Sequence, residues 1–121
     1  MTTPEEDYST AERLISRLEL LDRRRAPLHA RYGAFGTFEH ERKNVLAACR
    51  DSVRLAAESR LSEATIDDMA RKAPEYQTFI SSAYSERTKL ALIDAERMAL
   101  SHRIENLKAY TYAAARLARL T

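Results

Sequence analysis

The chain has 121 residues, of which 45% are hydrophobic and 31% charged, and its formal net charge is +2. That is the size of one domain, with enough apolar material for a core. Two glycines and three prolines are too few for a β-rich fold with many tight turns. The single cysteine, Cys49, excludes an intramolecular disulfide and the zinc sites built from two or four cysteines.

A first helix is expected over about residues 9–31, after a disordered lead of residues 1–8. Ser9 or Thr10 can cap this helix, because a side-chain oxygen there accepts a bond from a free backbone N–H group. Its apolar residues recur at intervals of four and three, which is the spacing of one helical face. These residues are Leu14, Leu18 and Leu21.

Pro27 is expected to kink or stop the first helix, because proline lacks the backbone donor and crowds the preceding turn. The seven-residue pattern nevertheless continues through Leu28, Tyr32 and Phe35, so a kinked continuation of the helix stays open. The glycines at positions 33 and 36 then break the pattern.

Two shorter helices are expected next, over residues 37–60 and 62–73. Thr37 and Ser62 are their predicted caps. Cys49 lies on the apolar stripe of the helix over 37–60, so it is interpreted as a small core residue. The helix over 62–73 must end before Pro74, since the residue before a proline avoids the α region.

A long fourth helix is expected over residues 74–119, because Pro74 suits a first helical position and no glycine or proline follows it. At 1.5 Å per residue such a helix is roughly 65 Å long. Apolar residues spaced alternately by three and four form a heptad seam, which Glu86 and Arg97 interrupt.

Such a long seam is not expected to be buried within a compact monomer of 121 residues. We expect it to pack on the helix over 37–60 along part of its length and on a neighbouring subunit along the rest. The fold class is therefore all-α: an extended helical hairpin or bundle, one domain over residues 9–121, that oligomerises through coiled-coil-like packing. The seam residues expected to hold an oligomer or a protein partner are Leu90, Ile93, Leu100, Ile104 and Leu107.

No catalytic, metal or cofactor site is found in the sequence, so the chain is interpreted as a binding or assembly protein and not as an enzyme. None of the three histidines has a second ligand at helical metal spacing. No apolar run approaches the ~20 residues that cross a membrane, and the acidic start of the chain does not resemble a secretory signal. A cytoplasmic location, in a bacterium or a phage-infected host, is expected.

Charge is distributed unevenly along the chain. Residues 1–22 carry −4, residues 23–60 carry +5, residues 61–100 carry −2 and residues 101–121 carry +3. The basic zones are consistent with polyanion binding, with antiparallel charge matching between helices, or with a mixed solvated surface.

Basic and aromatic residues interleave in two places, which favours single-stranded nucleic acid as a partner. Sixteen of the twenty basic residues are arginines, whose guanidinium groups pair with phosphates, while tyrosine rings stack on unpaired bases. The simpler interpretation is that cations near a helix C-terminus complement its dipole. The candidate nucleic-acid-binding residues are Arg23, Arg24 and Arg25, together with Arg103, Lys108, Tyr110, Tyr112, Arg116 and Arg119.

One part of the chain resembles a known family in outline. A short capped helix, then a tyrosine-bearing start of a long helix, then a basic tail occur in Leu61-Ser62-Glu63-Ala64-Thr65-Ile66, Ala73-Pro74-Glu75-Tyr76, Ala95-Glu96-Arg97 and Arg103-Ile104-Glu105-Asn106-Leu107. This outline, over residues 61–116, resembles the UvsY-type phage recombination mediators. The resemblance implies a closed homo-oligomer that binds single-stranded DNA and helps a recombinase to load.

Two hypotheses follow from the sequence. The first is a non-catalytic, oligomeric protein that binds single-stranded DNA, with a recombinase or another protein as a further partner. The alternative is a helical protein–protein interaction module, such as a scaffold, a chaperone or an inhibitor of a host protein, with no role on nucleic acid.

Overall fold

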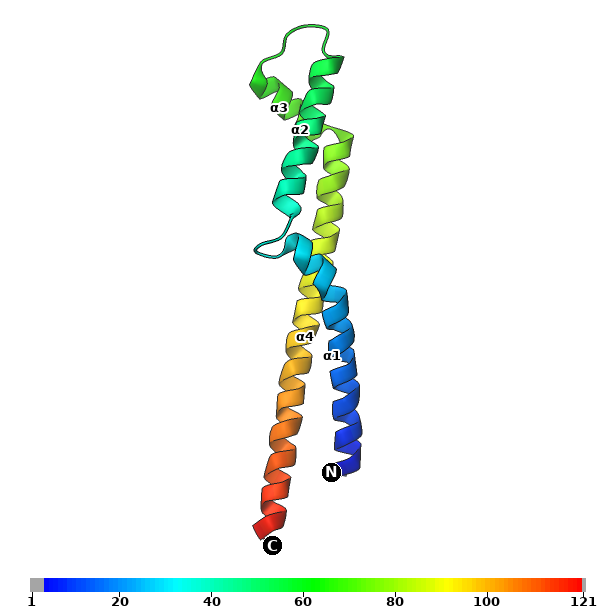
Figure 1. Cartoon of the computed structure of the whole chain (residues 1–121), viewed down its shortest axis with the longest axis vertical. Helices are drawn as coiled ribbons and strands as arrows, with labels where there is room; N and C mark the ends of the chain where they lie inside the picture. The colour runs from blue at the N-terminus through cyan, green and yellow to red at the C-terminus, as the bar shows by residue number, and fades with distance from the viewer. Residues whose placement is uncertain (1–3, 121) are drawn as a thin grey trace. The chain divides into compact units, whose positions relative to one another are not determined.

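The computed structural model describes residues 4–120, with side chains from residue 9 onward. Over this range the chain forms helices and no strand (Figure 1), so the expected all-α class with one long C-terminal helix is confirmed. The helices are α1 (Pro4–Tyr32), α2 (Phe38–Ala56), α3 (Glu63–Lys72) and α4 (Pro74–Leu120).

The chain divides into two compact units, and the single domain over residues 9–121 stays a prediction. The first unit combines Met1–Pro27 with Leu90–Thr121, and the second is Leu28–Lys89. Each unit has its own apolar core. The division arises because α4 contributes its first turns to one core and its later turns to the other.

Helix α1 begins at Pro4 and not at Ser9 or Thr10, so these two residues lie inside the helix and do not cap it. Proline fits a first helical position, since its missing N–H would have no helical partner there and its φ is already helical. The expected disordered lead is therefore helical over residues 4–8, and residues 1–3 lie outside the described part of the chain.

Helix α1 also continues through Pro27 to Tyr32. An interior proline costs a helix about 3 kcal/mol, because it removes one hydrogen bond and crowds the preceding turn. Apolar packing on both sides of the proline offsets this cost, as Leu21 is fully buried before it and Tyr32 packs on Phe38 after it. The boundary between the two units in α1 falls directly after Pro27.

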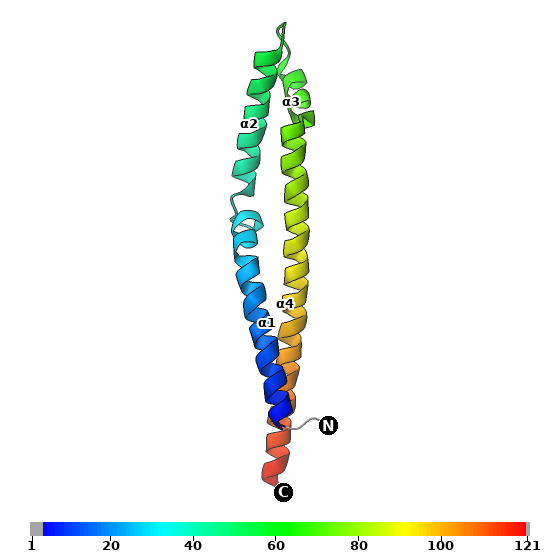
Figure 2. The ribbon, with the colours of Figure 1, turned by 90° about the vertical axis from the view of Figure 1, so that its right-hand side faces the viewer.

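The core of the first unit is formed by α1 and the later turns of α4, which lie side by side in both views and run antiparallel (Figures 1 and 2). The leucines that recur along one face of α1 supply one side of it. The buried and partly buried members of this core are Leu14, Leu18 and Leu21 on α1, with Ile93, Leu100, Ile104 and Leu107 on α4.

Helix α1 thus covers the part of the seam for which a neighbouring subunit was expected. A second copy is not needed to bury Ile93, Leu100, Ile104 and Leu107, because α1 is long enough to lie along them. The polar interruption at Arg97 is also satisfied within the unit. Its Nε lies 2.6 Å from Oδ1 of Asp22.

The second unit packs α2 and α3 against the first turns of α4. Leu46 and Cys49 of α2, Ala70 of α3 and Tyr76 of α4 are its buried core. Cys49 is a free, buried thiol, as its place on the apolar stripe of α2 predicted.

The predicted caps of α2 and α3 differ in outcome. Ser62 caps α3 as expected, because its Oγ accepts a bond from the Thr65 N–H at 3.2 Å. Thr37 makes no side-chain cap bond, since its backbone is already helical. Helix α2 ends at Ala56, earlier than the expected residue 60, because residues 57–62 must turn the chain so that Ile66 and Ala70 can be buried.

A tight loop joins α1 to α2, and it corrects the expectation for Phe35. The Gly36 N–H donates to the Gly33 carbonyl at 2.9 Å, and the Thr37 N–H donates to the Ala30 carbonyl at 3.3 Å. A Cβ at either glycine would collide with backbone atoms of the last turn of α1. Phe35 was expected to extend the apolar face of the first helix, but this loop places it in solvent, with a relative exposure of 104%.

We expect Leu21→Ala to lower the free energy of unfolding by about 2–4 kcal/mol, because it leaves a cavity in the α1–α4 core. Leu92→Ala is the matched control, since Leu92 is exposed on α4 in the same unit, and it should change stability by less than about 0.5 kcal/mol. Urea unfolding followed by helical circular dichroism measures both. Equal losses in the two variants would contradict the α1–α4 core.

Candidate functional site

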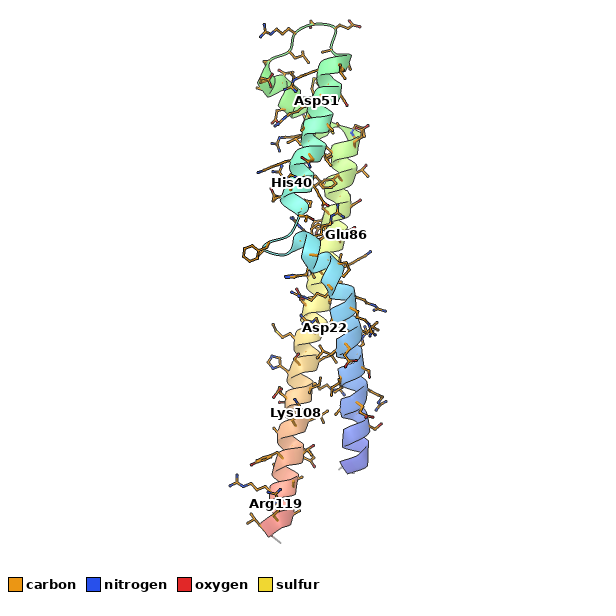
Figure 3. All side chains as sticks on the ribbon, viewed as in Figure 1. Asp22, His40, Asp51, Glu86, Lys108 and Arg119 are labelled. Carbon is orange, nitrogen blue, oxygen red and sulfur yellow. The ribbon has the colours of Figure 1, made fainter. Side chains whose placement is uncertain are left out.

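The last turns of α4, residues 108–120, are exposed throughout. They contain Lys108, Arg116 and Arg119 but no acidic residue. Lys108 lies 3.9 Å from Glu105 Oε1, whereas Arg116 and Arg119 form no ion pair with any side chain of residues 9–120. Figure 3 shows Lys108 and Arg119 on this part of α4. We refer to residues 108–120 as the C-terminal segment.

One face of the C-terminal segment carries three cations and one aromatic ring. Lys108, Tyr112, Arg116 and Arg119 follow one another at intervals of four, four and three, so they lie along one stripe of the helix. Tyr112 is 71% exposed. We call these four residues the basic stripe. Each of the four is a candidate nucleic-acid-binding residue from the sequence.

The other face of the C-terminal segment is apolar. Tyr110 and Leu117 lie on it, and their exposures are 46% and 65%. Leu120, which is 79% exposed, follows Arg116 by four residues and borders the basic stripe. Arg103, another candidate residue, is seven residues before Tyr110 and is exposed. Helical spacing therefore places Arg103 on the side of Tyr110 and not on the basic stripe.

The second candidate patch, at residues 23–25, is separate from the basic stripe and is partly occupied. Arg25 Nε lies 2.5 Å from Asp94 Oδ1, so Arg25 is engaged by a carboxylate of its own unit. Arg23 and Arg24 are exposed. From Asp94 to Lys108 is fourteen residues of α4, or roughly 21 Å at 1.5 Å per residue.

Many of the arginines that suggested polyanion binding instead pair with carboxylates of the chain. Arg17, for example, makes a two-pronged contact with Glu96, at 2.8 Å and 3.2 Å, and the hydrogen bond from Arg17 lowers the pKa of the Glu96 carboxyl. Arginines in described ion pairs are Arg17, Arg25, Arg31, Arg42, Arg50, Arg54, Arg71 and Arg97. Arginine abundance therefore reflects packing between helices at least as much as it reflects a ligand.

A polar cluster in the second unit fixes the end of α1 against α2 and α4. Arg31 contacts Glu41 at 2.7 Å and Glu86 at 3.1 Å. The Tyr32 hydroxyl donates to Glu86 Oε2 at 2.5 Å. The polar residue Glu86, which interrupts the heptad seam, thus has two partners on α1. Burial, and then the hydrogen bond to Glu86, raise the pKa of Tyr32 to about 12.

Aromatic and cationic groups extend this cluster. The rings of Phe38 and Phe79 stack with centroids 5.6 Å apart, and the Arg87 guanidinium lies 4.1 Å from the centroid of Phe38. Such cation–π contacts contribute about 0.5–1 kcal/mol at exposed sites. The cluster has the composition of a structural clamp, because Arg31 is paired with Glu41 and Glu86 and the Arg87 guanidinium lies over the ring of Phe38.

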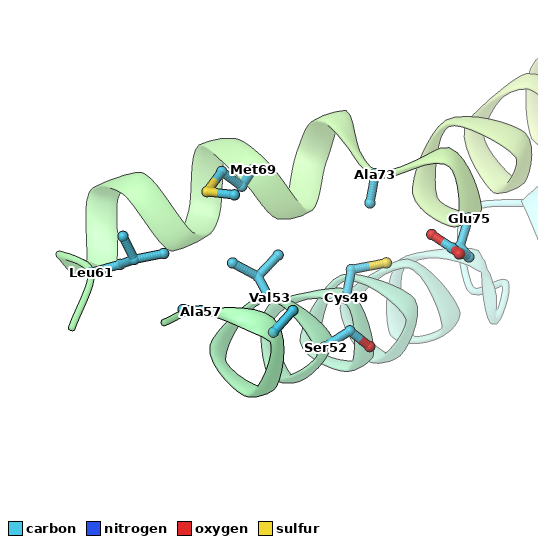
Figure 4. A pocket seen from close by; sticks show the side chains of 9 residues that line it. Cys49, Ser52, Val53, Ala57, Leu61, Met69, Ala73 and Glu75 are labelled. Atoms are coloured by element: carbon cyan, nitrogen blue, oxygen red, sulfur yellow. The ribbon is translucent and has the colours of Figure 1, made fainter. Parts of the chain in front are cut away.

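An apolar groove lies between α2 and α3, with a volume of about 250 Å³ (Figure 4). Cys49 and Val53 line it from α2, and Met69 lines it from α3. Glu75, at the start of α4, supplies its polar edge. The sequence did not predict this groove, because the angle between two short helices is not encoded in the periodicity of either one.

Neither a metal site nor a membrane span is found in the described residues. No three side chains among the histidines, cysteines and acids of this range are grouped so that they could hold a metal ion. No helix between residues 4 and 120 combines the length and the apolar character that crossing a membrane requires.

Tyr32 should make the stability of the fold depend on pH in the alkaline range. Its pKa rises from an ordinary 10.0 to about 12 in the fold, so the unfolded chain loses the phenolic proton first. The stabilisation of the fold that comes from the raised pKa of Tyr32 is complete below pH 10, and it is lost as the pH rises through about 12. We expect Tyr32→Phe to remove it, as measured by urea unfolding at about pH 9 and about pH 11.

The control is Tyr84→Phe, at an exposed tyrosine of the same unit. This variant should keep the full alkaline loss of stability. If the Tyr32→Phe variant loses as much stability between the two pH values as the unsubstituted chain, then Tyr32 does not hold its proton more tightly in the fold.

Comparison with known proteins identifies no relative: no protein-family model, no curated protein and no solved structure matches the chain.

Proposed function

We propose that the chain is a non-catalytic protein that binds single-stranded DNA through the C-terminal segment of α4. The observation that carries the proposal is the basic stripe. Three cations and one tyrosine follow one exposed helical face, and its two arginines form no ion pair with a described side chain. The proposed activity requires no metal and no cofactor.

The dimensions of the basic stripe favour a short stretch of backbone. Arg119 lies eleven residues after Lys108 on α4, or roughly 17 Å along the helix. Three cations on this span can each neutralise a phosphate, and Tyr112 between them can stack on an unpaired base, which a duplex keeps within its own stack. A single strand is therefore favoured over a duplex.

The strength of such binding is limited by the small number of phosphates contacted. With about three phosphates, the slope of log K against log salt is roughly −2 for a single strand. One copy of the chain should bind at low salt and release the strand as salt rises. Arg23 and Arg24 are exposed and carry a second, smaller positive patch.

A more specific proposal follows from the resemblance of residues 61–116, in outline, to the UvsY-type recombination mediators. On this proposal the chain acts in the cytoplasm of a bacterium or a phage-infected cell and helps a recombinase to load on single-stranded DNA. A closed homo-oligomer would place several basic stripes on one strand and multiply the weak affinity of each.

The double variant Arg116→Ala/Arg119→Ala should weaken binding at low salt by at least about tenfold and reduce the salt slope by about 1.4, because two phosphate contacts are lost. Tyr112→Ala should weaken binding by about 1–3 kcal/mol and leave the salt slope unchanged, because it removes stacking only. Fluorescence anisotropy of a labelled single strand of about 30 nucleotides measures both quantities.

Arg60→Ala/Lys89→Ala is the charge-matched control. It removes two exposed cations of the second unit and the same net charge. If this control lowers affinity and slope as much as the Arg116→Ala/Arg119→Ala variant, binding is a diffuse effect of net charge and the basic stripe is not the site.

A second candidate function, a helical module that holds a protein partner, is favoured by the apolar face of the C-terminal segment. Tyr110 and Leu117 are exposed there, at 46% and 65%. If the unsubstituted chain binds neither single strand nor duplex at about 20 mM salt, where phosphate contacts are strongest, the nucleic-acid proposal fails and this candidate takes its place.

A further inference from the structure

Phe35 is a fully exposed aromatic side chain on a loop of fixed shape. Its relative exposure is 104%. The loop is closed by backbone hydrogen bonds from Gly36 to Gly33 and from Thr37 to Ala30, and neither glycine has room for a side chain. The ring therefore projects from a pre-ordered turn, so its insertion into a partner would cost little backbone entropy.

The second unit also contains an unfilled apolar groove that is large enough for such a ring. The groove between α2 and α3 measures about 250 Å³ and is lined by Val53, Met69 and Cys49. A dry, apolar cavity of about 150 Å³ is sufficient to bind benzene. A phenyl group fits in the groove with room to spare.

The groove cannot be filled by Phe35 of the same copy. Phe35 lies three residues before the first residue of α2, and Cys49 lies eleven residues into that helix. Eleven residues of helix rise roughly 17 Å, which exceeds the reach of a phenylalanine side chain. As long as α2 is helical, a Phe35 ring that enters the groove must come from another copy.

We propose that Phe35 of one copy inserts into the α2–α3 groove of a second copy, so that the chain associates with itself through its second unit. A twofold arrangement would let each copy donate one ring and accept one ring. This association is independent of the basic stripe and of nucleic-acid binding, because it uses neither the C-terminal segment nor its charges.

Charge at the two surfaces is complementary. Glu75 lines the groove and forms no ion pair with a described side chain. Beside Phe35, the acids Glu39 and Glu41 are already paired with Arg42 and Arg31. Lys43, near the start of α2, is therefore an exposed cation without a described ion pair, and Glu75, at the edge of the groove, is an anion without one.

The surface area that the contact would bury determines the affinity expected for self-association. A buried aromatic side chain removes about 150–250 Å² from water, so two reciprocal rings and the groove walls that they cover fall short of the ~1,200 Å² of a stable interface. We therefore expect reversible self-association with a dissociation constant between about 10 μM and about 1 mM, and not a permanent dimer.

Photocrosslinking tests the contact without removing the aromatic ring. Phe35 is replaced by p-azidophenylalanine in the full chain, which is irradiated at about 200 μM. We expect a covalent dimer whose cross-linked peptides join position 35 to the stretch around Val53 or Met69. The same photoreactive residue at Tyr84, an exposed aromatic position of the same unit, is the control and should give at most about one tenth of the dimer.

The Cys49 thiol supplies a second readout in the unsubstituted chain, since Cys49 lines the groove. Its alkylation by N-ethylmaleimide should slow at least about threefold between about 5 μM and about 500 μM protein. The Phe35→Ala variant should react at one rate over the whole range. Cross-links confined to a single chain or to other segments, or a concentration effect that survives in Phe35→Ala, would overturn the proposal.

Discussion

The first unit depends on the burial of the α1 leucines against α4. Leu21 is the most completely buried large side chain of the described chain, and Leu14 and Leu18 extend its contact along the helix. Each such burial contributes about 1.5–3 kcal/mol by removing apolar surface from water. Without that cover, the seam of α4 from residue 93 to residue 107 would face solvent.

Ion pairs fix the register of the same two helices. Asp22 meets Arg97, Arg25 meets Asp94 and Arg17 meets Glu96. Antiparallel matching of charge between helices was one of the explanations of the uneven charge distribution that the sequence left open. These three contacts are ion pairs of that kind. Since the groups are substantially exposed, each pair contributes little to stability. Their effect is on specificity, because a shift of α1 by one turn would separate all three.

Much of the fold could be predicted from the sequence, because helix signals are local. Pro74 at the start of α4, Ser62 as the cap of α3 and the leucine repeat of α1 all depend on residues within a few positions of one another. What could not be predicted depends on distant packing. The passage of α1 through Pro27 is one case, since its cost is offset only by contacts with α4 and α2.

The candidate sites were predictable to a lesser extent. The cations and tyrosines of the C-terminal segment could be found by their helical spacing. Whether an arginine has a carboxylate partner could not, because Arg25 and Asp94 are 69 positions apart in sequence. The groove at Cys49 and the exposure of Phe35 could not be predicted either, because both follow from how the connecting loops orient the helices.

The C-terminal segment of α4 has a consequence for the energetics of recognition. Its side chains are exposed throughout, so its helical form rests on intrinsic propensity and on continuation from the packed turns before it. Such a segment unravels at a small fraction of the global unfolding free energy. A ligand that holds it helical must supply that ordering free energy, so affinity will fall with temperature faster than the contacts alone would suggest, and hydrogen exchange of these amides will slow on binding.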